Sequence, residues 1–280
     1  MENRINILIA GGDMRQIYCA KKLADIYNVE VIGIDSDFSG SDSTDGRYDC
    51  IVLPVPPLDE KGNINTPCSD DVISPDMLKK SMKNDCIVFT GQYDKRLDEL
   101  FPNSRIIDYM SREDLSLKNA VPTAEGAIQI ALDELPVTLS GLSVLIVGMG
   151  RIGTALAEIL KGFGADITVA VRNANGTGKA RVIGVKSVCT KDMDTDYGLV
   201  FNTAPELVFD RELLQKSGDD TLFIDLASRP GGFDFRSAVE LNKKVIWALG
   251  LPGKTAPITA GEIVAETIIN ILSEGDDEYE

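Results

Sequence analysis

The stretch Val144-Leu-Ile-Val-Gly-Met-Gly-Arg-Ile-Gly153 decides the fold of this chain. Four apolar residues run directly into a Gly-x-Gly-x-x-Gly turn, and apolar residues then recur at helical spacing as far as Phe163. In such a strand–turn–helix the first glycine makes the turn, the second lets a pyrophosphate approach and the third lets the helix pack on the strand. The free N–H groups at the helix start favour phosphates. The stretch predicts a dinucleotide-binding Rossmann domain; the alternative is the same turn in a domain that binds no nucleotide.

Short apolar runs alternate with helical spacing along the rest of the chain. The runs expected to be strands are residues 5–10, 29–34, 50–53, 86–90 and 105–107, then 144–147, 167–171, 199–202, 222–226 and 244–248. This alternation is typical of parallel sheets covered by helices. The predicted fold class is α/β, with two Rossmann-like parallel-sheet domains.

The chain is long enough for two domains. We expect a flavodoxin/Rossmann-like substrate domain over residues 1–118 and an NADP-binding Rossmann domain over 119–258. Residues 54–75 are expected to form a long loop, and a helix is expected near residues 122–135, where the first domain leads into the second. Residues 259–280 are predicted to form a helix that returns to the first domain, opened by a Thr259/Glu262 capping box and ended by a frayed acidic tail.

Composition excludes several functions. Lys plus Arg number 28 against 44 Asp plus Glu, a net charge of −16, which disfavours nucleic acid and anionic membranes as partners. The chain has no histidine, which excludes a Ser-His-Asp triad, a Cys-His dyad and any imidazole-ligated metal, so no metal is expected. Five scattered cysteines and the lack of a long apolar run predict a cytoplasmic protein with reduced thiols.

The residue that follows the strand at 167–171 bears on the choice of cofactor. Arg172 lies 19 residues beyond Gly153, where a carboxylate would accept the ribose 2′-hydroxyl of NAD. A guanidinium favours a 2′-phosphate instead, so the sequence favours NADP, with NAD less favoured. The alternative is a solvated charge at a strand end.

Polar and glycine-bearing loops follow several predicted strands. Loops at the carboxyl ends of parallel strands form the ligand crevice, although such residues also serve as turn chemistry. The residues expected to bind the cofactor are Gly148, Met149, Gly150, Arg151, Ile152, Gly153, Arg172, Asn173, Thr203, Ala204, Pro205, Leu226, Ala227 and Ser228. Residues 250–257 follow the last strand and are expected to border the same crevice.

Three cations in separate glycine-bearing loops are candidates for holding substrate carboxylates: Arg15, Arg229 and Lys254. Each of them alone is most simply a surface charge. Proton transfer has the candidates Asp13, Glu125, Asp225 and Lys254, and the sequence does not choose among them. Thr123 and Glu125 are also explained as the cap and dipole partner of a helix start. The catalytic candidates are Arg15, Glu125, Arg229 and Lys254, and the substrate-binding candidates are Gly12, Asp13, Arg15, Asn119, Thr123, Ser228 and Arg229.

Five motifs together resemble those of the dipicolinate synthase A-subunit family. They are Gly-Gly-Asp-x-Arg-Gln at 11–16, Asn-Ala-x-Pro-Thr-Ala-Glu-Gly at 119–126, the glycine turn at 148–153, Asp-Leu-Ala-Ser-Arg-Pro-Gly-Gly at 225–232 and Gly-Leu-Pro-Gly-x-x-Ala-Pro-x-Thr-Ala-Gly at 250–261. The resemblance implies an architecture like that of formate and glycerate dehydrogenases. It also implies an oxidoreductase of the mother cell of a sporulating bacterium, which acts with a flavoprotein-like B subunit. The reaction implied is oxidation of a dihydrodipicolinate, from the lysine/diaminopimelate branch, to pyridine-2,6-dicarboxylate.

The sequence leaves three functions open. The first is an NADP-dependent dehydrogenase that makes dipicolinate, with Arg15 and Arg229 each holding one carboxylate of the small dicarboxylate substrate. The second is a non-catalytic NADP-binding partner that regulates the B subunit. A 2-hydroxy-acid dehydrogenase is disfavoured, because its histidine base has no counterpart in the chain. A homo-oligomer is expected in each case.

Overall fold

The computed structural model describes residues 4–35, 37–38 and 47–277. The chain divides into two compact units, Met1–Asn119 with Ala256–Glu280, and Ala120–Thr255; the sequence places the corresponding boundaries after residues 118 and 258. The chain enters the second unit within helix α4 (Glu113–Glu134) and leaves it between α9 (Leu251–Thr255) and α10 (Pro257–Asp277). Each unit contains one parallel sheet, so the predicted fold class is confirmed.

The first unit is built on a five-stranded parallel sheet with the order β2-β1-β3-β4-β5. Its strands are β1 (Asn6–Ala10), β2 (Asn28–Ile32), β3 (Tyr48–Val52), β4 (Met82–Thr90) and β5 (Arg105–Asp108), and its shorter helices are α1 (Met14–Leu23), α2 (Pro75–Lys80), α3 (Arg96–Leu100) and the 3-10 turn η1 (Tyr109–Ser111). The strand order reverses beside β1. The loop that starts at Gly11 therefore opens where doubly wound sheets bind ligands.

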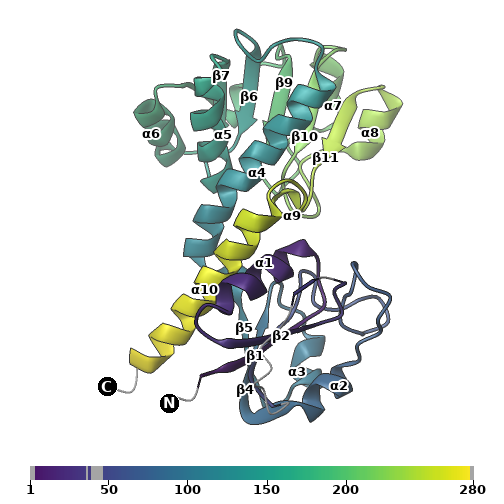
Figure 1. The fold of residues 1–280 in the computed structure, drawn as a ribbon. Helices are drawn as coiled ribbons and strands as arrows, with labels where there is room; N and C mark the ends of the chain where they lie inside the picture. Colours follow the sequence, from purple (N-terminus) through teal and green to yellow (C-terminus); the bar gives the residue numbers. More distant parts are fainter. Residues whose placement is uncertain (1–3, 36, 39–46, 278–280) are drawn as a thin grey trace. The chain divides into compact units, whose positions relative to one another are not determined.

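Helix α10 packs on α1 within the first unit (Figure 1). Its buried residues Ile263, Val264 and Ile268 join the core that includes β1 and β3. A Cβ added at Gly261 would lie 2.4 Å from the backbone oxygen of Arg15, so the two helices approach more closely than a side chain allows. This close crossing explains the glycine that ends the 250–261 motif.

The second unit contains a six-stranded parallel sheet with the order β11-β10-β9-β6-β7-β8. Its strands are β6 (Ser143–Val147), β7 (Asp166–Val171), β8 (Lys186–Cys189), β9 (Leu199–Asn202), β10 (Leu222–Asp225) and β11 (Lys244–Trp247). Its helices include α5 (Arg151–Gly162), α6 (Ala174–Ile183), α7 (Arg211–Lys216) and α8 (Phe235–Glu240), with the 3-10 turn η2 (Thr190–Asp192). The order reverses between β6 and β9, which is the Rossmann arrangement, so the loops after these strands flank one opening.

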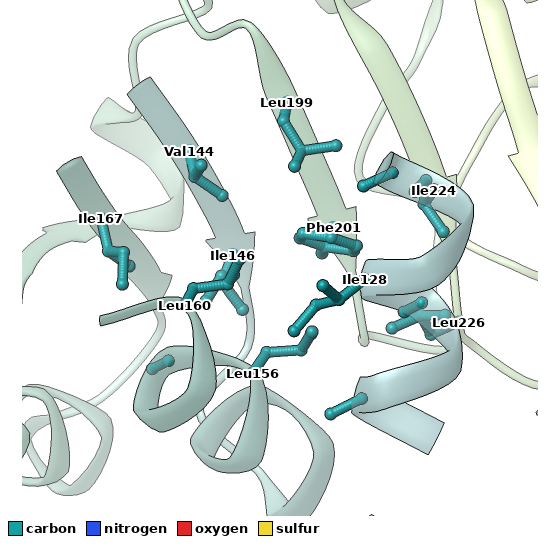
Figure 2. Packing of buried hydrophobic residues seen from close by; sticks show 14 of the residues in the cluster. Ile128, Val144, Ile146, Leu156, Leu160, Ile167, Leu199, Phe201, Ile224 and Leu226 are labelled. Carbon is teal, nitrogen blue, oxygen red and sulfur yellow. The ribbon is translucent and has the colours of Figure 1, made fainter. Parts of the chain in front are cut away.

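Both faces of this sheet are covered. Figure 2 shows Leu156 and Leu160 of α5 and Ile128 of α4 pointing at Ile146 and Phe201 of the sheet. The opposite face carries a separate cluster in which the rings of Phe209 and Phe233 stack 4.5 Å apart. Because both faces are buried, the strands are apolar almost throughout, which is why they could be predicted from continuous apolar runs.

The predicted starts of two helices are wrong. Helix α4 begins at Glu113, nine residues before Pro122, so Thr123 and Glu125 lie inside it and cannot cap its start. A proline removes one helical hydrogen bond and therefore suggested a helix start. Helix α10 begins at Pro257, and the Ala260 N–H already donates to the Ala256 carbonyl, so Thr259 does not open a capping box.

The acidic end of the chain is more ordered than the sequence suggests. The sequence predicts a frayed tail over residues 274–280, but α10 continues to Asp277, and residues 278–280 lie outside the described part of the chain. The Glu274 carboxylate accepts from Nη1 and Nη2 of Arg112 at 2.6 and 2.7 Å. This ion pair ties α10 to the residue just before α4 and anchors the last turns of the helix.

Substituting Gly261 tests the close crossing of α1 and α10. Gly261→Ala should lower the free energy of unfolding by about 1–3 kcal/mol, because the contacted atom belongs to the backbone and cannot turn away. Gly178→Ala is the matched control: it also lies within a helix, but an added Cβ meets nothing within 4 Å. It should stabilise the protein by up to about 1 kcal/mol. Urea unfolding measures both, and a Gly261→Ala protein as stable as wild type would contradict the close approach.

Candidate functional site

The glycine turn after β6 has the geometry of a phosphate-binding turn. Gly148 has a φ of +95°, and a Cβ at Gly153 would lie 2.1 Å from the backbone oxygen of Gly148. The backbone of the turn therefore requires glycine at both positions, independently of any ligand. A Cβ at Gly150, the N-cap of α5, would meet nothing within 4 Å. The open space above the second glycine leaves the N–H groups at the start of α5 accessible to an anion.

A cavity of about 280 Å³ opens beside this turn, at the carboxyl ends of β6, β7 and β9. Eight of the residues expected to bind the cofactor line it: Gly148, Met149, Gly150, Arg172, Asn173, Thr203, Ala204 and Pro205. The lining also includes Asn175, Gly176, Thr190 and Glu206, which the sequence did not single out. Thr190 was missed because the preceding strand, β8, is short and mostly exposed, and its residues give no apolar run.

Six other residues expected to bind the cofactor do not line this cavity. Arg151, Ile152 and Gly153 belong to the first turn of α5, directly after the turn that does line it. Leu226 and Ala227 directly follow β10 and are buried, and Ser228 is exposed in the same loop. The glycine turn and the loops after β7 and β9 therefore form the lining, whereas the loop after β10 lies outside it.

Arg172 and Glu206 form an ion pair at this cavity. Arg172 directly follows β7, and Glu206 lies in the loop after β9. These two strands flank β6, so the sheet brings together residues 34 apart in sequence. The next residue, Asn173, caps α6 by accepting from the Gly176 N–H at 3.0 Å. From α6, the Lys179 Nζ donates to the Met149 carbonyl at 3.4 Å, which places a second cation at the glycine turn.

The loop after β10 is organised by a buried carboxylate. Asp225 is fully buried, and its Oδ1 accepts from Asn202 Nδ2 at 2.7 Å and from the Ala227 N–H at 3.1 Å. Its Oδ2 accepts from the Gly232 N–H at 2.8 Å. With these three donors the Asp225 carboxylate fixes both ends of the loop, which is a positioning role rather than that of an available base.

The same loop presents Arg229 over an aromatic ring. The guanidinium carbon lies 5.8 Å from the centre of the Trp247 ring, within cation–π range. The Trp247 Nε1–H donates to the Ala227 carbonyl at 2.9 Å, so the ring is held by the loop that it supports. Among the described residues, no carboxylate pairs with Arg229, which leaves an exposed cation available to an anion in a strongly acidic protein.

In the first unit, the turn after β1 places Arg15 against Asp13. The Asp13 carboxylate caps α1 by accepting from the Arg15 N–H at 3.0 Å. It also binds the Arg15 side chain through Nε at 2.9 Å and Nη2 at 2.8 Å. Burial acts to raise the pKa of Asp13, but the hydrogen bonds and charge of Arg15 outweigh it, so the pKa lies below its usual range. The charge of Arg15 is therefore already balanced.

A small cavity lies next to this pair within the first unit. It has a volume of about 10 Å³, room for about one water molecule, and its lining includes Arg15, Gln16, Tyr109 and Asn119. The Gln16 Oε1 is buried without a hydrogen-bond partner among the described residues, whereas the Tyr109 hydroxyl donates to the Leu53 carbonyl at 3.2 Å. Of the first unit's predicted substrate residues, the cavity thus brings together Arg15 and Asn119.

The remaining candidates lie apart from these features. Glu125 is exposed and Thr123 half-buried in α4, and Lys254 is exposed in α9. Gly12 and Asp13 belong to the turn before α1. Within the described ranges, no cluster of three acidic or cysteine side chains is arranged to hold a metal ion. Among the same residues, no helix is both long and apolar enough to span a membrane.

Comparison with known proteins identifies relatives of both units. Residues 6–110 match the family described as the N-terminal domain of the dipicolinate synthase A subunit. Residues 119–230 match the NAD-binding domain of D-isomer-specific 2-hydroxyacid dehydrogenases. The dipicolinate synthase A subunit of Bacillus subtilis (strain 168) is 30% identical over 287 residues, which cover 96% of this chain and 96% of the relative.

Solved structures agree with these matches. The dipicolinate synthase A subunit from Bacillus halodurans superposes with a TM-score of 0.86 at 31% identity, covering 96% of this chain and 97% of the other. The dipicolinate synthase A subunit from Bacillus subtilis gives a TM-score of 0.87 at 29% identity, covering 99% of both chains. The cavity beside the glycine turn thus belongs to a dehydrogenase-type domain that binds a nicotinamide dinucleotide.

The ion pair of Asp13 with Arg15 predicts a pH-dependent contribution to stability. Asp13→Asn keeps a good N-cap for α1 but removes the charge. Because the folded-state pKa of Asp13 is lowered, its contribution is present above the unfolded pKa, about 4, and is lost as the pH falls through the folded value. About a third of the Asp13 side chain is exposed, so water screens the pair and we expect a loss of only about 1 kcal/mol at neutral pH.

Thermal unfolding of wild type and Asp13→Asn across the acid range measures this contribution. The difference between the two proteins should shrink below about pH 4. A gap that persists unchanged in acid would show that the Asp13 charge is not its source.

Proposed function

The chain belongs to the dipicolinate synthase A-subunit family, as its motifs predicted, and from that premise we propose that it oxidises a dihydrodipicolinate to pyridine-2,6-dicarboxylate with NADP⁺. Bound NADP⁺ supplies the hydride acceptor; the reaction turns one dihydrodipicolinate and one NADP⁺ into dipicolinate, NADPH and one proton. Because loss of the proton makes the ring aromatic, this oxidation demands less of a base than oxidation of a hydroxy acid, which suits a chain without histidine.

The observation that carries the choice of NADP is Arg172 on the wall of the cavity beside the glycine turn. The accessible start of α5 suits the pyrophosphate, and Arg172 lies at the end of β7, where the ribose 2′ position is expected. A guanidinium pairs with a phosphate through two parallel hydrogen bonds, which a ribose hydroxyl cannot match.

Arg229 is the substrate ligand that we propose on the strongest grounds. Its guanidinium is exposed, rests on Trp247 and has no carboxylate partner among the described residues, so it is available to a substrate carboxylate. Arg15 remains a second candidate, but its charge is balanced by Asp13. Glu125 and Lys254 remain the candidates for taking the proton, because the Asp225 carboxylate is occupied by three donors.

The proposal also includes the partner and the setting that the family resemblance implies. We propose that the chain acts with a flavoprotein-like B subunit in the cytoplasm of the mother cell of a sporulating bacterium. Its substrate would come from the lysine branch, and the chain would form a homo-oligomer. The alternative, a non-catalytic NADP-binding partner of the B subunit, predicts the same nucleotide cavity but no hydride transfer by this chain.

The assay that tests the function measures NADPH absorbance and dipicolinate formation with a dihydrodipicolinate and NADP⁺. It compares the purified chain with the chain mixed with its B subunit. NADPH and dipicolinate should appear in equal amounts, and the Arg229→Ala variant of this chain should remove both. Turnover that is unchanged when Arg229 or residues of the nucleotide cavity are substituted would favour the non-catalytic alternative.

Reversing the charge of Arg172 tests the cofactor assignment. Arg172→Asp should weaken NADP binding by about 2 kcal/mol, roughly thirtyfold, and leave NAD binding within a few-fold, because a bidentate contact becomes repulsion. Arg181→Asp is the control: it makes the same charge change on α6, but Arg181 does not line the cavity. Titration calorimetry compares the three proteins, and unchanged NADP affinity in Arg172→Asp would refute the assignment.

Trp247 is the chain's one tryptophan and therefore reports on Arg229. Adding dipicolinate to wild type should change tryptophan fluorescence, because a bound carboxylate alters the cation over the ring. Arg229→Ala should lose about 2–4 kcal/mol of dipicolinate binding, with NADP affinity almost unchanged. Arg236→Ala, which removes an exposed arginine of α8, should bind dipicolinate as wild type does. Equal dipicolinate affinity in all three proteins would make Arg229 a surface charge.

A further inference from the structure

We infer that Glu206 sets how strongly the cavity prefers a dinucleotide with a 2′-phosphate, by competing with that phosphate for Arg172; the inference rests on the proposed NADP function. Both side chains line the cavity beside the glycine turn and pair with each other there. The pair is formed across two loops, one after β7 and one after β9.

The pair is built so that it can open. The side chain of Arg172 is 66% exposed and that of Glu206 is 49% exposed, so water competes with both partners. Exposed ion pairs of this kind contribute little net free energy. Glu206 also lines a second cavity of about 300 Å³, whose lining includes Lys191 and Lys216. Lys216 is already paired with Glu212, which lines the same cavity, so a carboxylate displaced from Arg172 has open space and Lys191 towards which it can turn.

A 2′-phosphate is the stronger partner for Arg172. It carries nearly two negative charges and three acceptor oxygens, against one charge on a carboxylate. While Glu206 holds Arg172, however, each NADP molecule must displace a competing anion and then accept a like charge nearby. Glu206 thereby weakens NADP binding. It also narrows the difference in affinity between NADP and NAD, because NAD has no group that must displace the carboxylate.

The opposite role for Glu206 is also chemically defined. A carboxylate at the end of a Rossmann strand accepts a hydrogen bond from the ribose 2′-hydroxyl and so favours NAD. That role directs the Glu206 carboxylate at ribose, whereas in the structure its Oε1 accepts from Nη1 of Arg172. The two roles predict opposite effects of neutralising Glu206, so one variant distinguishes them.

The test is titration calorimetry of wild type, Glu206→Gln and Glu240→Gln with NADP⁺, NAD⁺, 2′,5′-ADP and 5′-AMP. Glu240 is a matched control: it is also half-exposed and paired with an arginine, Arg211, in the same unit, but it lines neither cavity. Both substitutions raise the net charge by one, so a general charge effect appears in both variants. Thermal unfolding of each variant confirms that it is folded.

Glu206→Gln should bind NADP⁺ and 2′,5′-ADP roughly three- to tenfold more tightly than wild type. NAD⁺ and 5′-AMP should bind within about twofold of wild type, and Glu240→Gln should match wild type for all four. Weaker binding of NAD⁺ and 5′-AMP in Glu206→Gln would overturn the inference in favour of ribose recognition, and unchanged binding of all four would overturn it outright. If wild type binds none of the four, the proposed function fails and the inference fails with it.

Discussion

The contact between Gly153 and the backbone oxygen of Gly148 is the constraint on which the second unit depends. Because Gly153 has no side chain that would clash with this oxygen, α5 can begin directly over the end of β6. The N–H groups at its start are then accessible beside Gly150. The strand order then determines what meets these groups. Strands β7 and β9 flank β6, so the loops after them bring Arg172 and Glu206 to the same opening. One tight turn and one sheet order thus place an accessible helix N-terminus, a cation and a carboxylate together.

Much of this fold could be predicted from the sequence, because strands buried on both faces are apolar throughout. Helix ends were harder to predict. Helix α4 runs through Pro122. Leu115 in its first turn is buried in the core of the first unit, and one missing hydrogen bond does not end the helix. The strand at 186–189 was missed because it lies at the sheet edge, mostly exposed, and has no apolar pattern.

The kinds of residue at the site could also be predicted, but their partners could not. Three arginines were expected to meet anions: Arg172 the 2′-phosphate of the cofactor, and Arg15 and Arg229 the carboxylates of the substrate. In the structure Arg15 is balanced by Asp13, Arg172 by Glu206, and Arg229 rests on Trp247 with no carboxylate partner among the described residues. In a chain with a net charge of −16, the pull of a guanidinium on a ligand depends on which carboxylates the fold brings near it. These pairings depend on the tertiary structure and cannot be predicted from a sequence pattern.

The central claim is that this chain holds NADP through Arg172 and a dicarboxylate through Arg229. A crystal structure of the chain with NADP⁺ and dipicolinate tests both halves directly. We expect the pyrophosphate at the start of α5, the 2′-phosphate against Arg172 with Glu206 turned away, and a dipicolinate carboxylate on the Arg229 guanidinium. A 2′-phosphate bound away from Arg172, or dipicolinate bound without contact to Arg229, would contradict the account.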